Sequence, residues 1–195
     1  FVSKYSYGYS RHSLPFSPKI YNKRFLGKHP RRGDVIVFKT PADNRTDYIK
    51  RLIGLPGDTV QIINQDLYIN DVKIIKKKIE NSSSIYCGNE ILRTDFFEET
   101  LPNGEKYVAV YKKDGTMRNS DKFLVPKGHY FFMGDNRDCS KDSRFLSSVG
   151  YVSFNNLVGK AQLIFFSNDK KKGSFFKFWQ WKQTVRFDRF FKKIK

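Results

Sequence analysis

Cysteine is scarce in this chain, with Cys87 and Cys139 the two among 195 residues. Two isolated cysteines are too few for a zinc cluster or for the disulfide framework of a small secreted domain, so we expect both thiols to be free. Histidine is also sparse. His12, His29 and His129 are the three in the chain, and none stands in a context typical of a cysteine protease.

Motifs for metal and phosphate chemistry are missing as well. The chain has no His-Glu-x-x-His run, and the Gly-Leu-Pro-Gly-Asp sequence at 54–58 has neither the lysine nor the spacing of a phosphate-binding loop. We therefore expect no metal and no cofactor.

Long apolar runs are absent from the sequence, since no stretch of about 18 apolar residues occurs. No secretory leader is visible at the start, and the first residue is Phe1 rather than methionine. We expect the chain to be a fragment or a processed product, soluble or peripheral to a membrane as given.

Acidic residues are outnumbered, with 19 Asp and Glu against 37 Lys and Arg and a formal net charge of +18. This excess predicts an anionic neighbour such as nucleic acid, anionic lipid or an acidic protein. The lysines are spread over the chain rather than gathered in one arginine-rich helix, which argues against nucleic acid. A lysine-biased proteome is the alternative explanation.

Short runs of β-branched and aromatic residues dominate from Gly33 onward and predict a mostly β fold. We expect strands at 35–38 and 47–53, and then a meander of strands at 59–63, 67–69 and 72–75 with turns at 64–66 and 70–71. Strand patterns resume at 123–125, 130–133 and 157–166. No long amphipathic helix is expected before the C-terminal tail.

The segment 77–122 is charged and rich in turn residues, with one strand-like run at 107–111, so we expect a smaller β-rich insertion there. The main β domain is then discontinuous, over 1–76 and 123–168. Residues 169–195 form a tail in which basic and aromatic residues alternate. This mixture suits the headgroup layer of a membrane, and a solvated basic tail is the alternative.

Three segments together indicate a function: Arg-Gly-Asp-Val-Ile-Val-Phe at 32–38, Tyr-Ile-Lys-Arg-Leu-Ile-Gly-Leu-Pro-Gly-Asp at 48–58, and Gly-Asp-Asn-Arg-Asp-Cys-Ser-Lys-Asp-Ser-Arg at 134–144. In order and content they resemble bacterial type I signal peptidases, which are membrane-anchored serine–lysine peptidases. The resemblance covers roughly residues 1–167, and the insertion matches in position only. It implies a signal-peptidase-like catalytic β-sheet domain.

Lys50 is the candidate general base. On an extended strand it shares a face with Tyr48 and Leu52, which places its amine among apolar groups. An ordinary lysine has a pKa near about 10.4 and is a poor base at neutral pH. Burial can lower that pKa by up to about 3–5 units, so a desolvated Lys50 can deprotonate a serine. The resemblance assigns this base to Lys50.

The segment 134–144 is expected to support the base. By resemblance, Ser140 orients the Lys50 amine through a hydrogen bond, and Asp142 and Arg144 form a supporting ion pair. Arg51, which faces away from Lys50, is expected to join this ionic support. We expect three further residues to secure the turn through local hydrogen bonds rather than to touch substrate: Asp135, Asn136 and Arg137.

Two features depart from the family pattern. Cys139 stands where asparagine is common, which places a thiol near the site. The nucleophilic serine of the family lies in a Ser-Met-x-Pro segment after the membrane anchor, and no serine of this chain stands in that context. The resemblance therefore places the nucleophile and the oxyanion hole upstream of Phe1, and we expect the chain alone to be inactive.

The resemblance implies cleavage of signal peptides from exported preproteins after small residues. It implies an anchored protein with its catalytic domain on the outer, periplasmic face of a bacterial inner membrane, in contact with the lipid surface. We expect no nucleic acid partner, and an obligate oligomer is not implied.

Other interpretations remain open from the sequence. Mitochondrial and repressor-type serine–lysine peptidases are related, although the β-rich insertion favours the bacterial form. A non-catalytic basic β domain that binds anionic lipid or nucleic acid is the alternative of a different class. A third interpretation is that the reading frame was truncated and that the chain is a decaying or regulatory remnant.

Overall fold

The meander predicted from the sequence is present, and the backbone of its two turns explains why Asn, Gln and Asp occupy them. The computed structural model describes residues 1–10, 13, 24–80, 85–88, 90–113, 115, 117–165, 167 and 189–194. Asn64 and Gln65, and then Asn70 and Asp71, all have positive φ. Two successive residues with positive φ are the mark of a tight hairpin turn, in which Asn and Asp are favoured. The described residues fold mostly as β-strands, as predicted.

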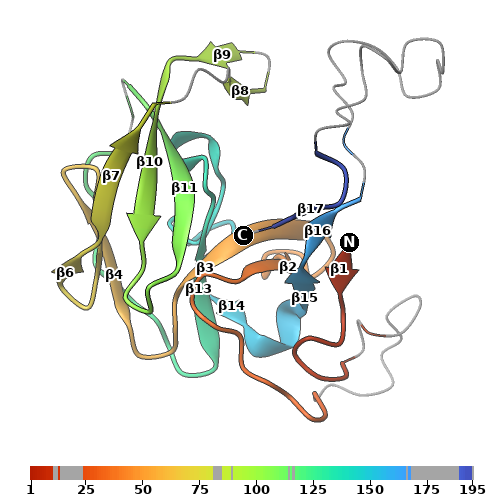
Figure 1. The fold of residues 1–195 in the computed structure, drawn as a ribbon. Coiled ribbons are helices and arrows are strands. Elements are labelled where there is room, and N and C mark those ends of the chain that lie inside the picture. Colours follow the sequence, from red (N-terminus) through yellow and green to blue (C-terminus); the bar gives the residue numbers. More distant parts are fainter. Residues whose placement is uncertain are drawn as a thin grey trace, which may run out of the picture.

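The first sheet holds most of the strands of the main domain (Figure 1). Its order is β1-β15-β2-β3-β13-β14, and each neighbouring pair is antiparallel. Its strands run over Val2–Ser3 (β1), Leu157–Ala161 (β15), Val35–Lys39 (β2), Asp47–Gly54 (β3), His129–Met133 (β13) and Val152–Ser153 (β14).

A second group of sheets lies beside β3 and β13, on the left in Figure 1. The meander Thr59–Ile63 (β4), Asp66–Ile69 (β5) and Val72–Lys73 (β6) pairs through β4 with Phe123–Leu124 (β12). The insertion contributes a sheet of order β11-β10-β7, formed by Lys106–Lys112, Thr94–Thr100 and Ile75–Ile79.

Three small features complete the described chain. Ile85–Cys87 (β8) and Glu90–Leu92 (β9) form a hairpin at the end of the insertion, and Leu163–Ile164 (β16) pairs with Lys192–Lys193 (β17) near the C-terminus (Figure 1). The described residues include the short 3-10 helices η2 at Arg137–Cys139 and η3 at Phe154–Asn156. Among the helices formed by the described residues, none is long and apolar enough to cross a membrane.

Strands β3 and β13 separate two hydrophobic cores, because adjacent side chains on a strand point to opposite faces. Phe132 and Leu52, which oppose each other across the two strands, belong to the core that includes Ile36, Phe38 and Val152. The register shifts between Phe131 and Phe132, so that Phe131 faces Gly54 and Ile53 is the extra residue of a bulge.

The second core, which contains Phe131 and Ile53, is shared by the meander and the insertion. Ile62 and Leu67 of the meander pack in the same cluster as Tyr107 and Ala109 of β11. The expected boundary between residues 76 and 77 falls within β7. The insertion is therefore built onto the main domain through a common core, and the domain boundaries stay a prediction. Most of the predicted tail 169–195 lies outside the described residues.

The packing of Phe132 leads to the first prediction. Its side chain is fully buried, and its ring centroid lies 4.6 Å from that of Phe38. Phe132→Ala is expected to lower the free energy of unfolding by about 3–5 kcal/mol, because it opens a cavity between strands that cannot collapse freely. Urea unfolding followed by circular dichroism measures the change. Phe145→Ala, at a partly exposed ring, is the control, and equal losses in the two variants would contradict the core assignment.

Candidate active site

Lys50 lies on β3 where the sequence predicted, on the same face as Tyr48. It stands opposite Ile36 of β2, whose side chain is buried in the core that contains Leu52. The Lys50 amine lies 5.7 Å from the centroid of the Tyr48 ring, within the range of a cation–π contact. The side chain is half-buried. The amine thus sits at the edge of an apolar core rather than in open solvent.

Burial lowers the pKa of Lys50 below its ordinary value. The negative charge of Asp142 opposes this shift, the positive charge of Arg144 adds to it, and Asp135 opposes it more weakly. Desolvation disfavours the ammonium form, and the outcome is a larger share of neutral amine at a given pH. That is the property a general base requires.

The side chains of Ser140 and Lys50 both lie close to Gly134. A β-carbon placed on Gly134 would lie 2.1 Å from Ser140 Oγ and 3.6 Å from Lys50 Nζ. Gly134 therefore has to be glycine for the Ser140 side chain to lie there, whereas Lys50 Nζ would be in ordinary van der Waals contact with the added carbon. Ser140 Oγ is buried and has no hydrogen-bond partner among the described residues. The expected bond from Ser140 to Lys50 is thus not formed in this arrangement, and the orienting role of Ser140 stays a prediction.

Asp142 and Arg144 form the ion pair that the resemblance implied. Arg144 Nε lies 2.8 Å from Asp142 Oδ1, and Arg144 Nη2 lies 2.8 Å from Asp142 Oδ2. Asp142 is fully buried, and its Oδ2 also accepts a hydrogen bond of 2.9 Å from the Gly134 amide. Ser143 Oγ accepts another from the Phe132 amide at 2.9 Å. The segment is therefore fastened to the end of β13 beside Lys50.

Arg51 lies on the opposite face of β3 from Lys50 and pairs with Asp135, and its support of the site stays a prediction. Its Nε and Nη2 each lie 2.8 Å from a carboxylate oxygen of Asp135, and its guanidinium lies 4.3 Å from the Tyr107 ring centroid. A bidentate arginine–carboxylate pair has fixed geometry. Asp135 was expected to make local turn contacts, but its side chain pairs with Arg51.

The other two turn residues also reach beyond the turn, which corrects the expectation of local hydrogen bonds. Asn136 forms a bridge with Val110 of β11. Arg137 is almost fully buried, and its guanidinium binds both carboxylate oxygens of Glu99 in β10, at 3.0 and 2.6 Å. The physical reason is that the insertion packs directly on η2 and supplies partners that a solvent-exposed turn would lack.

Sequence reasoning missed the acidic partner of Arg137. Glu99 stands beside Glu98 in β10, where the two buried residues are Phe96 and Glu99, so strict alternation of burial does not mark it. Its one sequence signal is its place two residues after Phe97, because residues two apart on a strand share a face. Two phenols complete the cluster, since Tyr107 Oη and Tyr111 Oη each donate to a Glu99 oxygen at 2.5 Å. We call Glu99, Arg137, Tyr107 and Tyr111 the Glu99 cluster.

The two cysteines are joined, and the expectation of free thiols was wrong. Cys87 of β8 and Cys139 of η2 form a disulfide with a Cα–Cα distance of 5.7 Å. The bond ties the tip of the insertion to the residue just before Ser140. Sequence spacing did not indicate the pair, because the two cysteines are 52 residues apart and meet only when the insertion folds back on η2.

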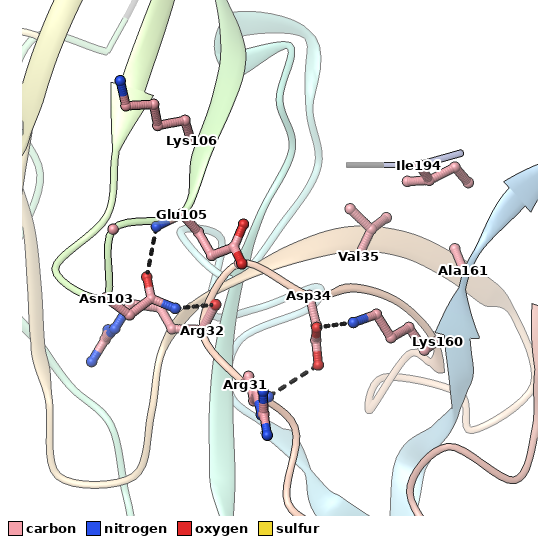
Figure 2. A pocket seen from close by; sticks show the side chains of 12 residues that line it. Arg31, Arg32, Asp34, Val35, Asn103, Glu105, Lys106, Lys160, Ala161 and Ile194 are labelled. Carbon is pink, nitrogen blue, oxygen red and sulfur yellow. Dashed lines mark hydrogen bonds and ion pairs between the residues drawn. The ribbon is translucent and has the colours of Figure 1, made fainter. Parts of the chain in front are cut away.

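Figure 2 shows a polar cavity of about 800 Å³. It is lined by the start of β2, the turn before β11 and the end of β15, including Val35, Glu105 and Lys160. Val35 opposes Arg51, whereas Lys50 opposes Ile36. Directly opposed residues share a face of a sheet, so the cavity lies on the Arg51 side of β2 and β3. It is not the pocket of the candidate base.

In the described part of the chain, no group of three or more His, Cys, Asp or Glu residues is placed to hold a metal ion. The site itself offers a partly desolvated amine with a serine and an ion pair beside it. Such an amine can accept a proton from a hydroxyl group or a water molecule.

Comparison with known proteins finds a matching family model and similar sequences. The family model described as signal peptidase, peptidase S26, matches residues 1–166. Signal peptidase I of Rickettsia bellii (strain OSU 85-389) is 43% identical, over 100% of this chain and 71% of that protein. Signal peptidase I of Rickettsia typhi is 42% identical, over 100% of this chain and 78% of that protein. A solved signal peptidase I from Enterococcus faecalis V583 is 32% identical and covers 68% of this chain and 97% of that one, with a TM-score of 0.39.

The disulfide gives a stability prediction. A double variant, Cys87→Ser with Cys139→Ser, is expected to lower the free energy of unfolding by about 4 kcal/mol, the loop-entropy value for this separation. Urea unfolding with and without a reductant measures the change. The wild-type chain in reductant should match the variant, and a midpoint that neither change moves would contradict a structural disulfide.

The lowered pKa of Lys50 gives a prediction on stability against pH. At pH values below the folded-state pKa, Lys50 is charged while partly buried, and this lowers the free energy of unfolding. The loss becomes smaller as the pH rises toward the unfolded-state pKa near about 10.4. Lys50→Met is therefore expected to stabilise the fold at neutral pH, by an amount that shrinks toward pH 10. Thermal unfolding across pH measures it. Lys78→Met, at an exposed lysine, is the control, and a gain that grows with pH would contradict the assignment.

Proposed function

The chain belongs to the signal peptidase family, peptidase S26, and we propose that it cleaves signal peptides from exported preproteins with Lys50 as the general base. Members of this family are serine endopeptidases. The observation that carries the proposal is the half-buried Lys50 amine with a lowered pKa, close to Ser140 and to the Asp142–Arg144 pair. A neutral amine held in this position is suited to activate a serine hydroxyl.

The proposed reaction has two stages. In the first, neutral Lys50 takes the proton of the nucleophilic serine, whose oxygen attacks the scissile carbonyl carbon. The C–N bond then breaks, the Lys50 ammonium gives its proton to the leaving amine, and an ester links the signal peptide to the serine. In the second, Lys50 deprotonates a water molecule that attacks this ester, and the serine recovers its proton as the peptide leaves.

The nucleophile in this proposal comes from sequence before Phe1. The family's Ser-Met-x-Pro segment does not occur between residues 1 and 195, and the donors of the oxyanion hole belong to the same region of the family pattern. The chain as given is therefore proposed to be inactive by itself, while it holds the base and the residues that support the base.

Strand β3 offers an edge for the substrate next to Lys50. β13 pairs with β3 only from Arg51 onward, so among the described strands the segment 47–50 has its partner β2 on one side alone. An extended peptide can add to such an edge through main-chain hydrogen bonds. We propose that the signal peptide lies here, with its scissile bond near the Lys50 amine and small residues before that bond.

Exposed aromatic residues support contact with a lipid surface. Tyr5, Tyr9 and Phe25 near the N-terminus and Phe165 and Phe191 near the C-terminus are all more than half exposed. Aromatic rings are favoured at membrane interfaces. We propose that this end of the domain rests on the outer face of a bacterial inner membrane, which also suits the net charge of +18.

The test compares the full-length protein, including the sequence before Phe1, with the chain 1–195. Cleavage of a signal-peptide substrate is expected from the full-length protein only, and Lys50→Ala is expected to reduce kcat by about 10²–10⁴-fold because the base is lost. Lys78→Ala, which removes an exposed lysine, is the control and should retain activity.

Three outcomes would contradict the proposal. Activity of residues 1–195 alone would contradict an upstream nucleophile, and activity of the full-length Lys50→Ala variant would contradict the base. A full-length protein that cuts nothing but binds anionic lipid or nucleic acid would favour the non-catalytic alternative, and binding to nucleic acid should then fall steeply with salt.

A further inference from the structure

The insertion holds the segment 134–144 through a buried ion pair, and we infer that Glu99 is a positioning residue for the Lys50 site. Glu99 lies in β10, within the inserted part of the chain, and does not touch Lys50. Its influence passes through Arg137 of η2. The inference rests on the proposed function, because it assigns Glu99 to the support of the same base.

Glu99 is buried with its charge fully partnered. Its side chain is 1% exposed, and that of Arg137 is 3% exposed. Each Glu99 oxygen binds one Arg137 nitrogen and one phenol, since Tyr111 donates to Oε1 and Tyr107 to Oε2. Arg137 in turn donates to both phenol oxygens, at 2.6 Å each. A buried charge is tolerated only with partners of this kind, and each Glu99 oxygen has two of them.

The charged state of Glu99 is favoured despite its burial. Burial by itself would raise the pKa of Glu99, but the Arg137 charge and the hydrogen bonds from Tyr107, Tyr111 and Arg137 outweigh it and hold the pKa below its ordinary value. Glu99 therefore stays ionised over the pH range in which Lys50 has to act. The ion pair that fixes Arg137 is permanent under those conditions.

Arg137 is connected to the groups around Lys50 by three further hydrogen-bonded contacts. Its main-chain oxygen accepts a hydrogen bond of 2.5 Å from Arg144 Nη2. Arg144 binds Asp142 through two nitrogens, and Asp142 accepts from the Gly134 amide. Gly134 is the point at which Ser140 and Lys50 converge. A shift of Arg137 would therefore move the groups that surround the Lys50 amine.

Neighbouring contacts show that η2 is attached to the insertion along its whole length. The Val110 amide donates to the Asp135 main-chain oxygen at 2.8 Å, and the Lys112 amide donates to Asp138 at 2.8 Å. The disulfide adds a covalent tie at Cys139. The Glu99–Arg137 contact differs from these because it is a buried charge pair. Loss of the Glu99 charge would leave the Arg137 guanidinium buried without a compensating charge.

A change at Glu99 reaches Lys50 through geometry rather than through its own charge. The charges that shift the Lys50 pKa are those of Asp142, Arg144 and Asp135. With Glu99→Gln, an unneutralised Arg137 pulls η2 toward solvent, and water gains access to the Lys50 amine. Its pKa then rises toward the ordinary value, and less neutral base is present at neutral pH.

The experiment measures kcat and KM against pH in the full-length protein. Glu99→Gln is expected to reduce kcat at pH 7 about 10-fold to 100-fold with KM little changed, and to move the acidic limb of kcat upward by on the order of one pH unit. Glu98→Gln is the matched control: it makes the same chemical change at the adjacent residue of β10, where Glu98 pairs with an exposed Lys106. Its profile should equal that of the wild type.

Tyr111→Phe keeps the inference testable if Glu99→Gln does not fold. It removes one donor to Glu99 and retains the ion pair, so a smaller upward shift of the same limb is expected. A merely structural role predicts instead that kcat falls with the folded fraction, measured by circular dichroism, while the limb stays in place. That result in both variants would overturn the inference. If Glu99→Gln does not fold, the same result in Tyr111→Phe would overturn it.

Failure of the proposed function is separable from failure of this inference. If the wild-type full-length protein does not cleave, or cleaves without Lys50, the function itself is wrong. If wild-type cleavage depends on Lys50 but Glu99→Gln and Tyr111→Phe match Glu98→Gln at every pH, the positioning role of Glu99 alone is wrong.

Discussion

The antiparallel pairing of β3 with β13 is the constraint on which the site depends. It brings Met133 opposite Arg51, so that the chain leaving β13 passes beside Lys50. Alternation along β3 then sends Lys50 and Arg51 to opposite faces. One face offers the apolar surroundings that lower the pKa of Lys50, and the other offers the Arg51–Asp135 pair that holds the departing segment. A register slip of one residue would exchange these two surroundings.

The polar groups around this pairing are of two kinds, which differ in whether an opposite charge compensates their burial. Arg51, Arg144 and Asp142 are each matched by an opposite charge at hydrogen-bond distance. Lys50 has no ion-pair partner of this kind among the described residues, and desolvation is the largest influence on its pKa. The matched pairs hold their side chains in place, and the unmatched amine is the group that we propose exchanges a proton.

The insertion is part of this arrangement rather than an appendage. It shares a hydrophobic core with β3 and β13 through Tyr107 and Ala109, and it reaches η2 through main-chain hydrogen bonds, the disulfide and the Glu99 cluster. The segment 134–144 is thus held from two directions, by β13 and by the insertion. Positional precision of this kind is what a general base requires from its surroundings.

The sequence by itself determined the strands 35–38 and 47–53, the meander and its turns, and the face on which Lys50 lies, because each depends on patterns within a few residues. Family resemblance added the Asp142–Arg144 pair, two residues apart. Tertiary structure alone decided the Glu99–Arg137 pair, 38 residues apart, and the Cys87–Cys139 disulfide, 52 residues apart. Those contacts form only where the insertion folds back on η2, and no local pattern encodes where a loop of that length returns.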